Sequence, residues 1–386
     1  TGANNMAVGD LALGANTTAD GNTAVGTSAL DANTIGGLNV GVGYLALTAN
    51  TEGSYNTAVG TSALATATTA GRNTAVGYVA LTANTSGLYN SSVGAWSSYS
   101  NTTGSNNTAM GYVALYANTT GSSNTAIGYG ALDANTTAGD STAVGANSLT
   151  ANTTGANNTA FGSSALMANT TGTLNVAVGR SALISNTTGE KNVSIGAYAG
   201  DANVTNHDNV TIGSYAGTDS SSGAIVCIGS YAGEQITTGA YNICVGYDSG
   251  SYTNNLTTGE KNICLGAFSH TSASDGDAQI AMGYNVGCTG NSNFTFGFGT
   301  TDSNIAFGGT SVTAPSDVRL KEDIQDEKVG LEFINELRPV TYLWKKEKDI
   351  PEEMVTYKAG SEERVMNGKH NHGFIAQEVK ALIDKT

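Results

Sequence analysis

One short phrase, Asn-Thr-Ala-Val-Gly, returns along most of the chain, and its spacing limits what the chain can fold into. The glycine that closes each copy stands at 9, 26, 43, 60, 77, 94, 111, 128, 145, 162, 179, 196 and 213, always 17 residues apart. Further copies close at Gly229, Gly246, Gly266, Gly283, Gly297 and Gly308, at uneven intervals. Nineteen copies of one short unit predict a solenoid, in which each copy forms one coil and stacks on the next.

Two columns of side chains precede the repeat glycine. The residue just before it is apolar, and the residue two before it is small. Neighbouring residues of a strand point to opposite faces, so this segment is expected to be a strand that is buried on both sides. We expect the large column to face the interior of the coil and the small column to pack against a second, tighter contact that identical chains supply. This prediction places Val59, Val76, Val144 and Val178 inside the coil, and Ala58, Ala75, Ala143 and Ala177 on the opposite face.

Asparagines mark the other fixed positions of the unit. One stands four residues before the glycine in most copies, as at Asn22, and another stands seven residues after it, as at Asn33 and Asn50, with Ala67 the exception. Between them, Ala-Leu pairs predict a second short strand, and Asn-Thr-Thr-Gly predicts a turn, since Asn and Gly tolerate left-handed backbone. Coils about 4.8 Å apart place like residues on like, so Asn side chains can form a ladder along a rod of roughly 90 Å. The expected fold is all-β, a parallel β-solenoid or β-roll of 17-residue repeats.

The phrase "NTAVG" followed by "AL" resembles the S-x-A-I-G … A units in the head domains of trimeric autotransporter adhesins. The resemblance is one of repeat pattern and covers residues 1–308, although the 17-residue period is longer than that family's usual unit. It implies a trimer of left-handed parallel β-rolls, and hence a trimeric fibre.

Charge is distributed unevenly along the chain. Residues 1–315 hold 4 Lys and Arg and 16 Asp and Glu, whereas residues 316–386 hold 12 and 15. We expect no nucleic-acid partner, because no basic stripe in the body can neutralise phosphates. We expect no membrane insertion either, because no apolar run approaches the ~20 residues that span a bilayer and no signal peptide opens the chain. The chain begins within the repeat, so we expect further residues upstream.

The cysteines are interpreted as structural. Cys227, Cys244 and Cys264 each stand two residues before a repeat glycine, in the small column. A free thiol there behaves as one more small buried side chain. The spacing of the four cysteines resembles no zinc site, so we expect no metal and no cofactor.

Composition changes after Gly308, and all three prolines lie at 315 or later. We therefore expect a solenoid over 1–308, a linker over 309–315 and a small α+β module over 316–386. In the module, "VGLEFINEL" has apolar residues at helical spacing, and "RPVTYLWK" alternates like a strand. The segment "HGFIAQEVKALIDK" is expected to place Phe374, Ile375, Val379, Leu382 and Ile383 on one helical face.

Three ordered motifs of this module, "SDVRLKEDI", "LRPVTYLWK" and "HGFIAQEV", resemble the intramolecular chaperone at the C-terminus of endosialidases and other phage tail fibres. The resemblance implies a trimer that guides the folding of the preceding fibre and then cleaves itself off at the Pro315–Ser316 bond. It maps the serine nucleophile onto Ser316 and its lysine base onto Lys321. A desolvated lysine can accept a serine proton, and an intramolecular attack gains much of its rate from geometry.

Other residues of the module have less specific roles. His372 either assists the cleavage or orients a loop, and we favour the structural role. Asp317, Arg319 and Glu378 are interpreted as ion-pair or trimer-contact residues. The family usually continues into a long helical segment, so we expect the chaperone to be incomplete at Thr386 and this chain to stay uncut.

The preferred function is a bacteriophage tail fibre or spike shaft on the virion. Its partners would be two further copies of the chain, other tail proteins, and a host cell-surface receptor or glycan. No external substrate is expected, because the only enzyme activity would be a single self-cleavage. The alternative is a trimeric adhesin on a bacterial surface that carries the same chaperone. A glycan-cleaving spike is the third class, but the body's acids show no pairing in the sequence.

Overall fold

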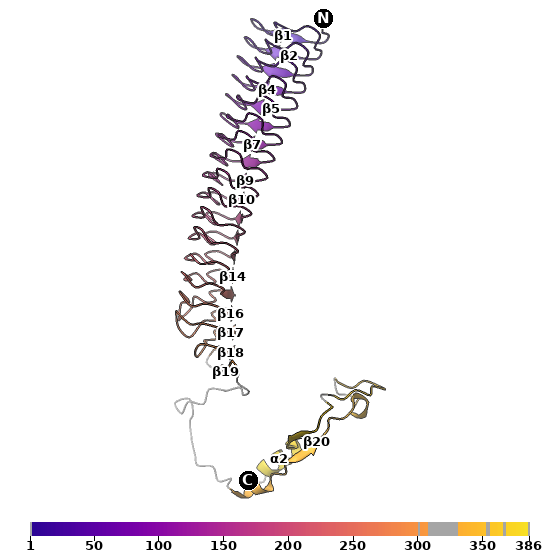
Figure 1. The fold of residues 1–386 in the computed structure, drawn as a ribbon, viewed down its shortest axis with the longest axis vertical. Coiled ribbons are helices and arrows are strands. Elements are labelled where there is room, and N and C mark those ends of the chain that lie inside the picture. Colours follow the sequence, from indigo (N-terminus) through magenta and orange to yellow (C-terminus); the bar gives the residue numbers. More distant parts are fainter. Residues whose placement is uncertain (1, 300–301, 308–330, 353–355, 366–367, 385–386) are drawn as a thin grey trace. The chain divides into compact units, whose positions relative to one another are not determined.

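The computed structural model describes residues 2–299, 302–307, 331–352, 356–365 and 368–384. Contacts divide the chain into two units, Thr1–Pro315 and Ser316–Thr386, which we describe separately (Figure 1). The expected linker over 309–315 lies outside the described residues, so the three-segment division stays a prediction.

The first unit is a parallel β-solenoid, as predicted. Its strands form one 19-stranded sheet in which β1 to β18 pair parallel, each with the strand one coil away. Most strands have three residues and end just before the repeat glycine. They are β1 Met6–Val8, β2 Thr23–Val25, β3 Val40–Val42, β4 Thr57–Val59, β5 Thr74–Val76, β6 Ser91–Val93, β7 Thr108–Met110, β8 Thr125–Ile127, β9 Thr142–Val144, β10 Thr159–Phe161, β11 Val176–Val178, β12 Val193–Ile195, β13 Val210–Ile212, β14 Val226–Ile228, β15 Ile243–Val245, β16 Ile263–Leu265, β17 Gln279–Tyr284, β18 Asn293–Phe298 and β19 Ser303–Ala306.

The strands stack in register, with like residue on like. Thr57 pairs with Thr74, Ala58 with Ala75, and Val59 with Val76. The flanking backbone continues the ladder. Thr57 N donates to Asn73 O at 2.8 Å, and Gly60 N donates to Val42 O at 2.8 Å. Each coil therefore obtains its backbone partners from the coils before and after it.

The predicted orientation of the two strand columns is wrong. The small column faces the interior: Ala58, Ala75, Ala143 and Ala177 are all 0% exposed. The large column faces outward: Val59 is 37% exposed, and Val76, Val144 and Val178 are half-buried. The reason is that the coil is thin and its interior is already occupied by leucines from the opposite side, such as Leu64, Leu81, Leu149 and Leu183.

The residues at the two inner positions of a coil change together along the solenoid. Most coils combine Ala in the strand with Leu four residues after the glycine, as in the fully buried pair Ala143 and Leu149. From β12 to β15 the strand instead carries Ser194, Thr211, Cys227 and Cys244, and the leucine position becomes Gly200, Gly217, Gly233 and Gly250. A Cβ added at Gly233 would stand 2.4 Å from Cys227 Sγ. In these coils the larger strand residue thus requires glycine at the leucine position, because the two side chains would otherwise collide.

The predicted second strand is absent. The segment with the Ala-Leu pairs forms turns with left-handed residues, such as Ser28 at φ 53° and Leu30 at φ 51°. These residues bend the chain where an extended strand would run straight, and this lets the coil close in one short unit. Hydrogen bonds between coils persist here: Leu30 N donates to Ala46 O at 3.0 Å, and Ser28 N donates to Asp10 O at 2.9 Å.

The predicted hydrogen bonding between stacked asparagines is confirmed, and it forms two separate ladders. In the first column, four residues before the glycine, Asn22 Oδ1 accepts from Asn39 N at 2.9 Å. In the second, seven residues after the glycine, Asn118 Nδ2 donates to Asn101 Oδ1 at 2.7 Å. Both columns are fully buried over most of the solenoid. Buried amides need partners, and the neighbouring coil is where they find them.

The predicted nineteenth coil does not form. Strand β19 runs antiparallel to β18, pairing Asn293 with Ala306. The interval from Gly297 to Gly308 is 11 residues, against 17 for a full coil, so the chain is too short to go round and turns back instead. The last parallel strands, β17 and β18, lengthen to 6 residues each.

The second unit is a small α+β module, as predicted. It contains helix α1 Leu331–Glu336, strand β20 Val340–Tyr342, a 3-10 turn η2 Glu347–Asp349, strand β21 Asn371–Gly373 and helix α2 Ala376–Ile383. Strands β20 and β21 are antiparallel and pair Thr341 with His372. The predicted apolar helix face is narrower than expected, because Phe374 and Ile375 precede α2 and Ile383 is 56% exposed.

The break in the second asparagine column generates a stability prediction. Asn50 Oδ1 is buried without a hydrogen-bond partner, because the next coil offers Ala67 in place of Asn. Ala67→Asn should complete the ladder and raise the free energy of unfolding by about 1 kcal/mol, since an unpaired buried polar group costs about 1–3 kcal/mol. Denaturant unfolding measures the change.

The opposite substitution is the matched control. Asn118→Ala breaks an intact part of the same ladder and should lower the unfolding free energy by about 1–3 kcal/mol. Ala70 does not obstruct the new side chain, because Asn135 donates to Ala138 O at 3.1 Å in a coil of the same composition. An unchanged or less stable Ala67→Asn variant contradicts the ladder as a source of stability.

Candidate functional site

A continuous column of apolar side chains lies on the outside of the solenoid. It consists of the residue just before the repeat glycine in each coil, and we call it the outer apolar column. Phe161 is 53% exposed, Met110 45% and Val59 37%. The column contains Val8, Val25, Val42, Val59, Val76, Val93, Met110, Ile127, Val144, Phe161, Val178, Ile195, Ile212, Ile228, Val245, Leu265, Met282 and Phe296.

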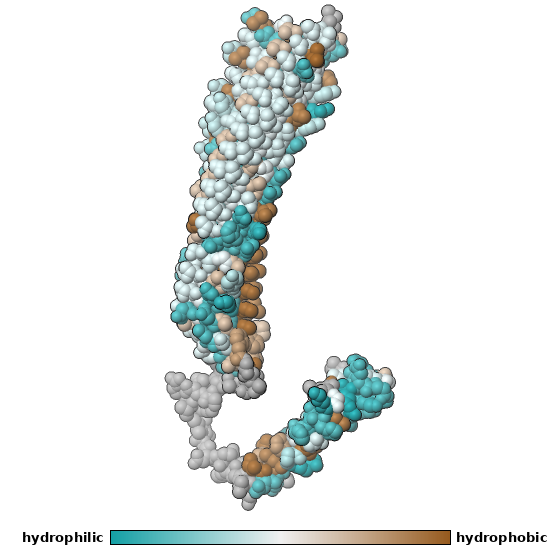
Figure 2. Space-filling model, in the orientation of Figure 1, coloured by the Kyte–Doolittle hydropathy of each residue, from teal (hydrophilic) through white to brown (hydrophobic). Residues whose placement is uncertain are grey.

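The outer face becomes more apolar toward the end of the solenoid. The first residue of the strand also points outward, and it is Thr in β2, β4, β5 and β7 to β10. From β11 to β16 it is Val or Ile: Val176, Val193, Val210, Val226, Ile243 and Ile263. Figure 2 shows the result as a brown stripe along the edge where β14 to β18 lie in Figure 1.

This stripe is unusual for a protein that acts as a single chain. Soluble monomers rarely expose large contiguous apolar surfaces, and such surfaces mark sites of association. The stripe also repeats at the coil spacing, so it is complementary to a second copy that stands beside it in register. Its chemistry suits a contact between copies of the chain.

Four carboxylates gather on successive coils, although the body's acids show no pairing in the sequence: Asp201, Asp219, Glu234 and Asp248. Partial burial and then the charge of Asp219 raise the pKa of Asp201. Partial burial, followed by the charges of Asp219 and Asp248, raises the pKa of Glu234. Their one-per-coil spacing was the signal that could have revealed the cluster. Among the described residues there is no group of three His, Cys, Asp or Glu side chains that could hold a metal ion.

The cysteines form a buried column. Cys227, Cys244 and Cys264 pair in register across β14 to β16, and all are free thiols. The hydrogen bond that the Cys264 thiol donates to Cys244, and then burial, raise the pKa of Cys264 well above its ordinary value. Such thiols stay protonated and unreactive. The structural interpretation of these residues is confirmed.

Of the residues predicted to take part in cleavage, the structure describes only His372. Pro315, Ser316 and Lys321, together with Asp317 and Arg319, lie outside the described residues. His372 lies on β21 with its side chain exposed, and its Nδ1 is 3.0 Å from Thr341 Oγ1 on β20. This contact ties the two strands together; whether His372 also assists the cleavage stays a prediction.

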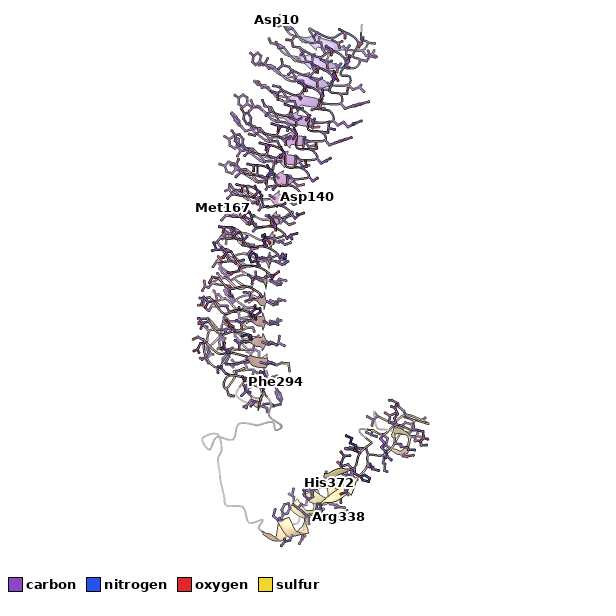
Figure 3. The ribbon with its side chains drawn as sticks, in the orientation of Figure 1. Asp10, Asp140, Met167, Phe294, Arg338 and His372 are labelled. Carbon is purple, nitrogen blue, oxygen red and sulfur yellow. The ribbon has the colours of Figure 1, made fainter. Side chains whose placement is uncertain are left out.

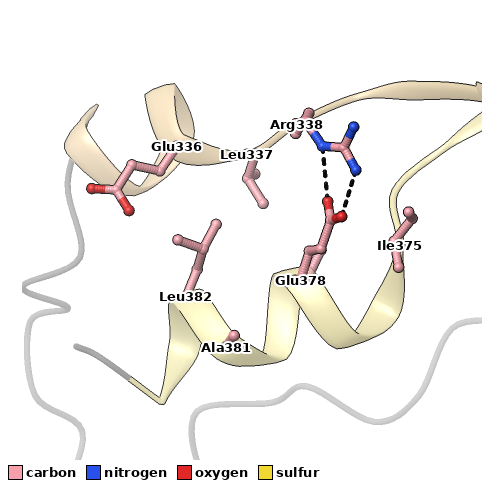
Figure 4. Close-up of a pocket in the computed structure, with 8 residues that line it drawn as sticks. Glu336, Leu337, Arg338, Ile375, Glu378, Ala381 and Leu382 are labelled. Carbon is pink, nitrogen blue, oxygen red and sulfur yellow. Dashed lines mark hydrogen bonds and ion pairs between the residues drawn. The ribbon is translucent and has the colours of Figure 1, made fainter.

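Glu378 makes the ion pair that its sequence position suggested. Arg338 Nε donates to Glu378 Oε2 at 3.1 Å, and a second bond joins Arg338 Nη2 to Glu378 Oε1 (Figure 4). The hydrogen bond from Arg338 lowers the pKa of Glu378. The pair connects the segment after α1 with α2 (Figure 4).

A hollow of about 290 Å³ lies beside this ion pair. Its walls are the end of α1 and one side of α2, formed by Glu336, Leu337, Arg338, Ile375, Glu378, Val379, Ala381 and Leu382 (Figure 4). Leu337 and Leu382 face each other across it. The walls are largely apolar and no His or Cys lines them, so the hollow is a packing surface rather than a reaction centre.

A second group of charges organises the middle of the module. Lys346 and Lys348 both contact Glu362 and lower its pKa to about 2. The Ser361 hydroxyl donates to Glu347 Oε2 at 2.7 Å, and Lys358 Nζ donates to Glu347 Oε1 at 3.1 Å. The Ser361 bond, and then Lys358, lower the pKa of Glu347.

Comparison with known proteins assigns the second unit. Residues 316–386 match the family Peptidase_S74, described as the chaperone of endosialidase. No curated protein and no solved structure matches the chain. In the described parts of both units, none of the helices is long and apolar enough to cross a membrane. The chain therefore carries a chaperone-of-endosialidase domain over residues 316–386, and a β-solenoid body precedes it in the sequence.

The two groups of carboxylates predict opposite responses to acid. In the C-terminal module the pKa values of Glu347, Glu362 and Glu378 are lowered on folding, so the unfolded state takes up protons first as pH falls. The module should be fully stabilised above about pH 4.5 and should lose stability as pH falls toward 2. In the solenoid, the raised pKa values of Asp201 and Glu234 predict a gain as pH falls from 7 through the raised values.

Unfolding followed between pH 7 and pH 2 tests both directions. Trp344 fluorescence reports the module in a Trp96→Tyr background, and circular dichroism reports the solenoid. Glu378→Gln should reduce the acid loss of the module. A module whose stability rises below pH 4, or a variant with an unchanged acid response, contradicts the assigned ion pairs.

Proposed function

We propose that three copies of the chain associate along the outer apolar column to form a fibre, and that the C-terminal chaperone domain brings them into register. The single observation that carries the proposal is the apolar column itself, which is exposed or half-buried in every coil of the solenoid. The fibre would serve as a bacteriophage tail fibre or spike shaft that presents its surface to a host cell.

A repetitive fibre needs a register guide. A slip of one 17-residue copy leaves almost every contact between coils and between chains satisfied. The interior offers little discrimination, because most coils repeat the same Ala, Leu and Asn side chains. A non-repetitive module that joins three chains at one point would set the register before the repeats associate. The family match of residues 316–386 supports this role.

The number three comes from the two resemblances, since both adhesin heads and endosialidase chaperones are trimers. Each three-residue strand presents only its first and third side chains outward, so the apolar surface of each chain is a narrow stripe. Three such stripes can face one another around a common axis. Burial of the column would then form a second core, between the chains, beside the core inside each coil.

The coil of Phe161 offers a matched test of the interface. Phe161→Asp places a carboxylate in the outer apolar column, and an uncompensated charge there costs several kcal/mol on association. We expect the parent protein to have the mass of three chains and this variant to have the mass of one. Sedimentation or light scattering measures the mass, and circular dichroism should show retained β-structure because Phe161 points to solvent within its own chain.

Met167 on the same coil is the control. It is 36% exposed and lies six residues after Phe161, outside the column (Figure 3). Met167→Asp should keep the mass of three chains. A trimeric Phe161→Asp variant, or a monomeric Met167→Asp variant, would place the interface elsewhere.

We further propose that the chaperone domain leaves by self-cleavage at Pro315–Ser316. Ser316 Oγ would attack the Pro315 carbonyl carbon while Lys321 accepts its proton; the C–N bond then breaks, and the proton passes to the new amine. Water hydrolyses the resulting ester and regenerates the hydroxyl. The family name supports a peptidase activity, and the motif "SDVRLK" supplies the residues.

Denaturing gels and N-terminal sequencing test the cleavage in the full-length gene product. The released piece should begin at Ser316. Ser316→Ala removes the nucleophile and Lys321→Ala removes the base, so both should give an uncut, folded trimer. His372→Ala should cut at the parent rate if its role is to tie β20 to β21. A different N-terminal residue, or undiminished cutting in Ser316→Ala, rules this mechanism out and leaves the fibre proposal standing.

The second candidate function is a trimeric adhesin on a bacterial surface. It uses the same column, chaperone and repeat, and differs only in where the fibre is attached. Antibody labelling of purified virions and of intact bacteria distinguishes the two. Label on virion tails supports the phage fibre, and label on uninfected cells supports the adhesin.

A further inference from the structure

One stretch of the solenoid differs from the rest in its surface chemistry. Residues 73–132 contain no Asp, Glu, Lys, Arg or His, yet they contain seven aromatic residues: Tyr78, Tyr89, Trp96, Tyr99, Tyr112, Tyr116 and Tyr129. Outside the outer apolar column, many of the remaining outward positions are Thr and Ser. The surface of these coils is therefore aromatic and hydroxylated, and it carries no charge.

Four of these rings form one cluster, which we call the Trp96 patch: Tyr78, Trp96, Tyr99 and Tyr116. The Trp96 ring centroid lies 5.7 Å from that of Tyr78, 4.9 Å from that of Tyr99 and 6.2 Å from that of Tyr116. Tyr99 and Tyr116 stack nearly parallel, with centroids 5.3 Å apart. Tyr78 is 52% exposed, and the other three rings are half-buried.

The patch is a departure from the repeat, and the coil does not need it. Trp96 occupies the second position after the repeat glycine, where other coils have Ser28, Ser62, Ser164 and Ser181. All of these residues share the same left-handed backbone, with φ 63° at Trp96 and 53° at Ser62. Tyr99 occupies the position held by Thr48, Thr82 and Thr150 in other coils. Coils that carry Ser or Thr at these positions close and stack in the same way, so the repeat does not require the aromatic side chains.

The backbone beneath the patch holds the rings in place. Trp96 N donates to Tyr78 O at 3.0 Å, and Ser100 N donates to Tyr116 O at 3.0 Å. The inner side of the same coil is fastened by a bond from Ser92 Oγ to Ser98 Oγ of 2.8 Å. The rings therefore start from a preorganised scaffold, which reduces the entropy lost when a ligand binds.

We infer that the Trp96 patch binds a neutral glycan. The face of a sugar ring presents C–H groups, which pack against the negative face of an aromatic ring, and its rim presents hydroxyls. Three coils at about 4.8 Å each give a platform of about 10 Å along the axis, which fits a short oligosaccharide and is small for a protein interface. This inference rests on the proposed adhesive fibre and specifies the class of its receptor.

The absence of charge selects a neutral sugar over an acidic one. Carboxylated or sulfated glycans are recognised through cations, and Arg or Lys is the usual partner of such groups. Arg72, just outside the stretch, is already placed between the rings of Tyr55 and Tyr89, 5.6 Å and 5.4 Å from their centroids. Its Nη1 also donates to Tyr89 Oη at 3.2 Å.

The chain contains two tryptophans, so Trp344→Phe leaves Trp96 as the only tryptophan, and its emission can be followed selectively. This variant is titrated with neutral hexasaccharides, namely maltohexaose, cellohexaose and galactohexaose, and with acidic ones from polysialic acid and heparin. We expect at least one neutral hexasaccharide to shift Trp96 emission and the acidic ones to leave it unchanged. A response to the acidic sugars alone, or to none of the panel, overturns the inference.

Calorimetry on matched variants places the site. Trp96→Ser and Tyr99→Thr install residues that other coils carry, so the fold is preserved, and each should weaken binding at least about tenfold. The control is Tyr215→Ser, which removes a stacked ring at the equivalent position among the coils with carboxylates. It should bind as the parent does. Unchanged binding by Trp96→Ser, or an equal loss in Tyr215→Ser, overturns the site.

The particle mass of each protein separates the two proposals. A trimer that binds no neutral hexasaccharide retains the fibre and refutes the glycan site. A monomer that binds one through Trp96 retains the site and refutes the proposed assembly.

Discussion

No coil of this solenoid can satisfy its own polar groups, and the rest of the structure depends on this constraint. Most coils bury two asparagines, and their amides bond to the coil before or after, as Asn118 does with Asn101 at 2.7 Å. The backbone of the strand and of the left-handed segment does the same. A coil shifted by one residue would bury these groups without partners, at a cost of about 1–3 kcal/mol each. The strict period of the sequence is the consequence, because each position must meet its own kind one coil later.

The same thin interior explains the surface. Leucines, asparagines and the small strand residue leave no room inside for a second large side chain, so the strand's other apolar residue faces solvent in the single chain. A coil of this size therefore produces an apolar outer column as a by-product of its own packing. Where Cys227 replaces the strand alanine, Gly233 replaces the leucine, because a Cβ there would lie 2.4 Å from the Cys227 sulfur. Ile225 and Ile236, both fully buried, occupy the interior of the same region. The outside also varies from coil to coil, and the aromatic and the acidic stretches lie there.

The period, the parallel strand, the Asn ladder and the α+β module were predictable, because each depends on local spacing that the sequence displays directly. The orientation of the strand was not, since alternation separates two faces without saying which of them is inside. The answer depended on Leu64 and its equivalents filling the interior from the other side. The left-handed turn at Leu30 was missed because a leucine with positive φ is uncommon, and the stacking of identical turns compensates for its strain. Ser316 and Lys321 rest on motif resemblance, and the carboxylate cluster was missed because residues far apart in sequence meet only after stacking.

The reversal of β19 has a consequence for how the rod ends. A parallel solenoid finishes in a coil whose backbone donors and acceptors face outward along the axis, and such an edge is a template for another rod. Strand β19 pairs antiparallel with β18, occupying part of that edge with a strand of the wrong direction and the wrong length to continue the repeat. A second rod that approached this end would find no in-register partner for its first coil. The short final interval thus ends the parallel stack, and it does so with a last strand that is unsuitable for pairing with a second solenoid.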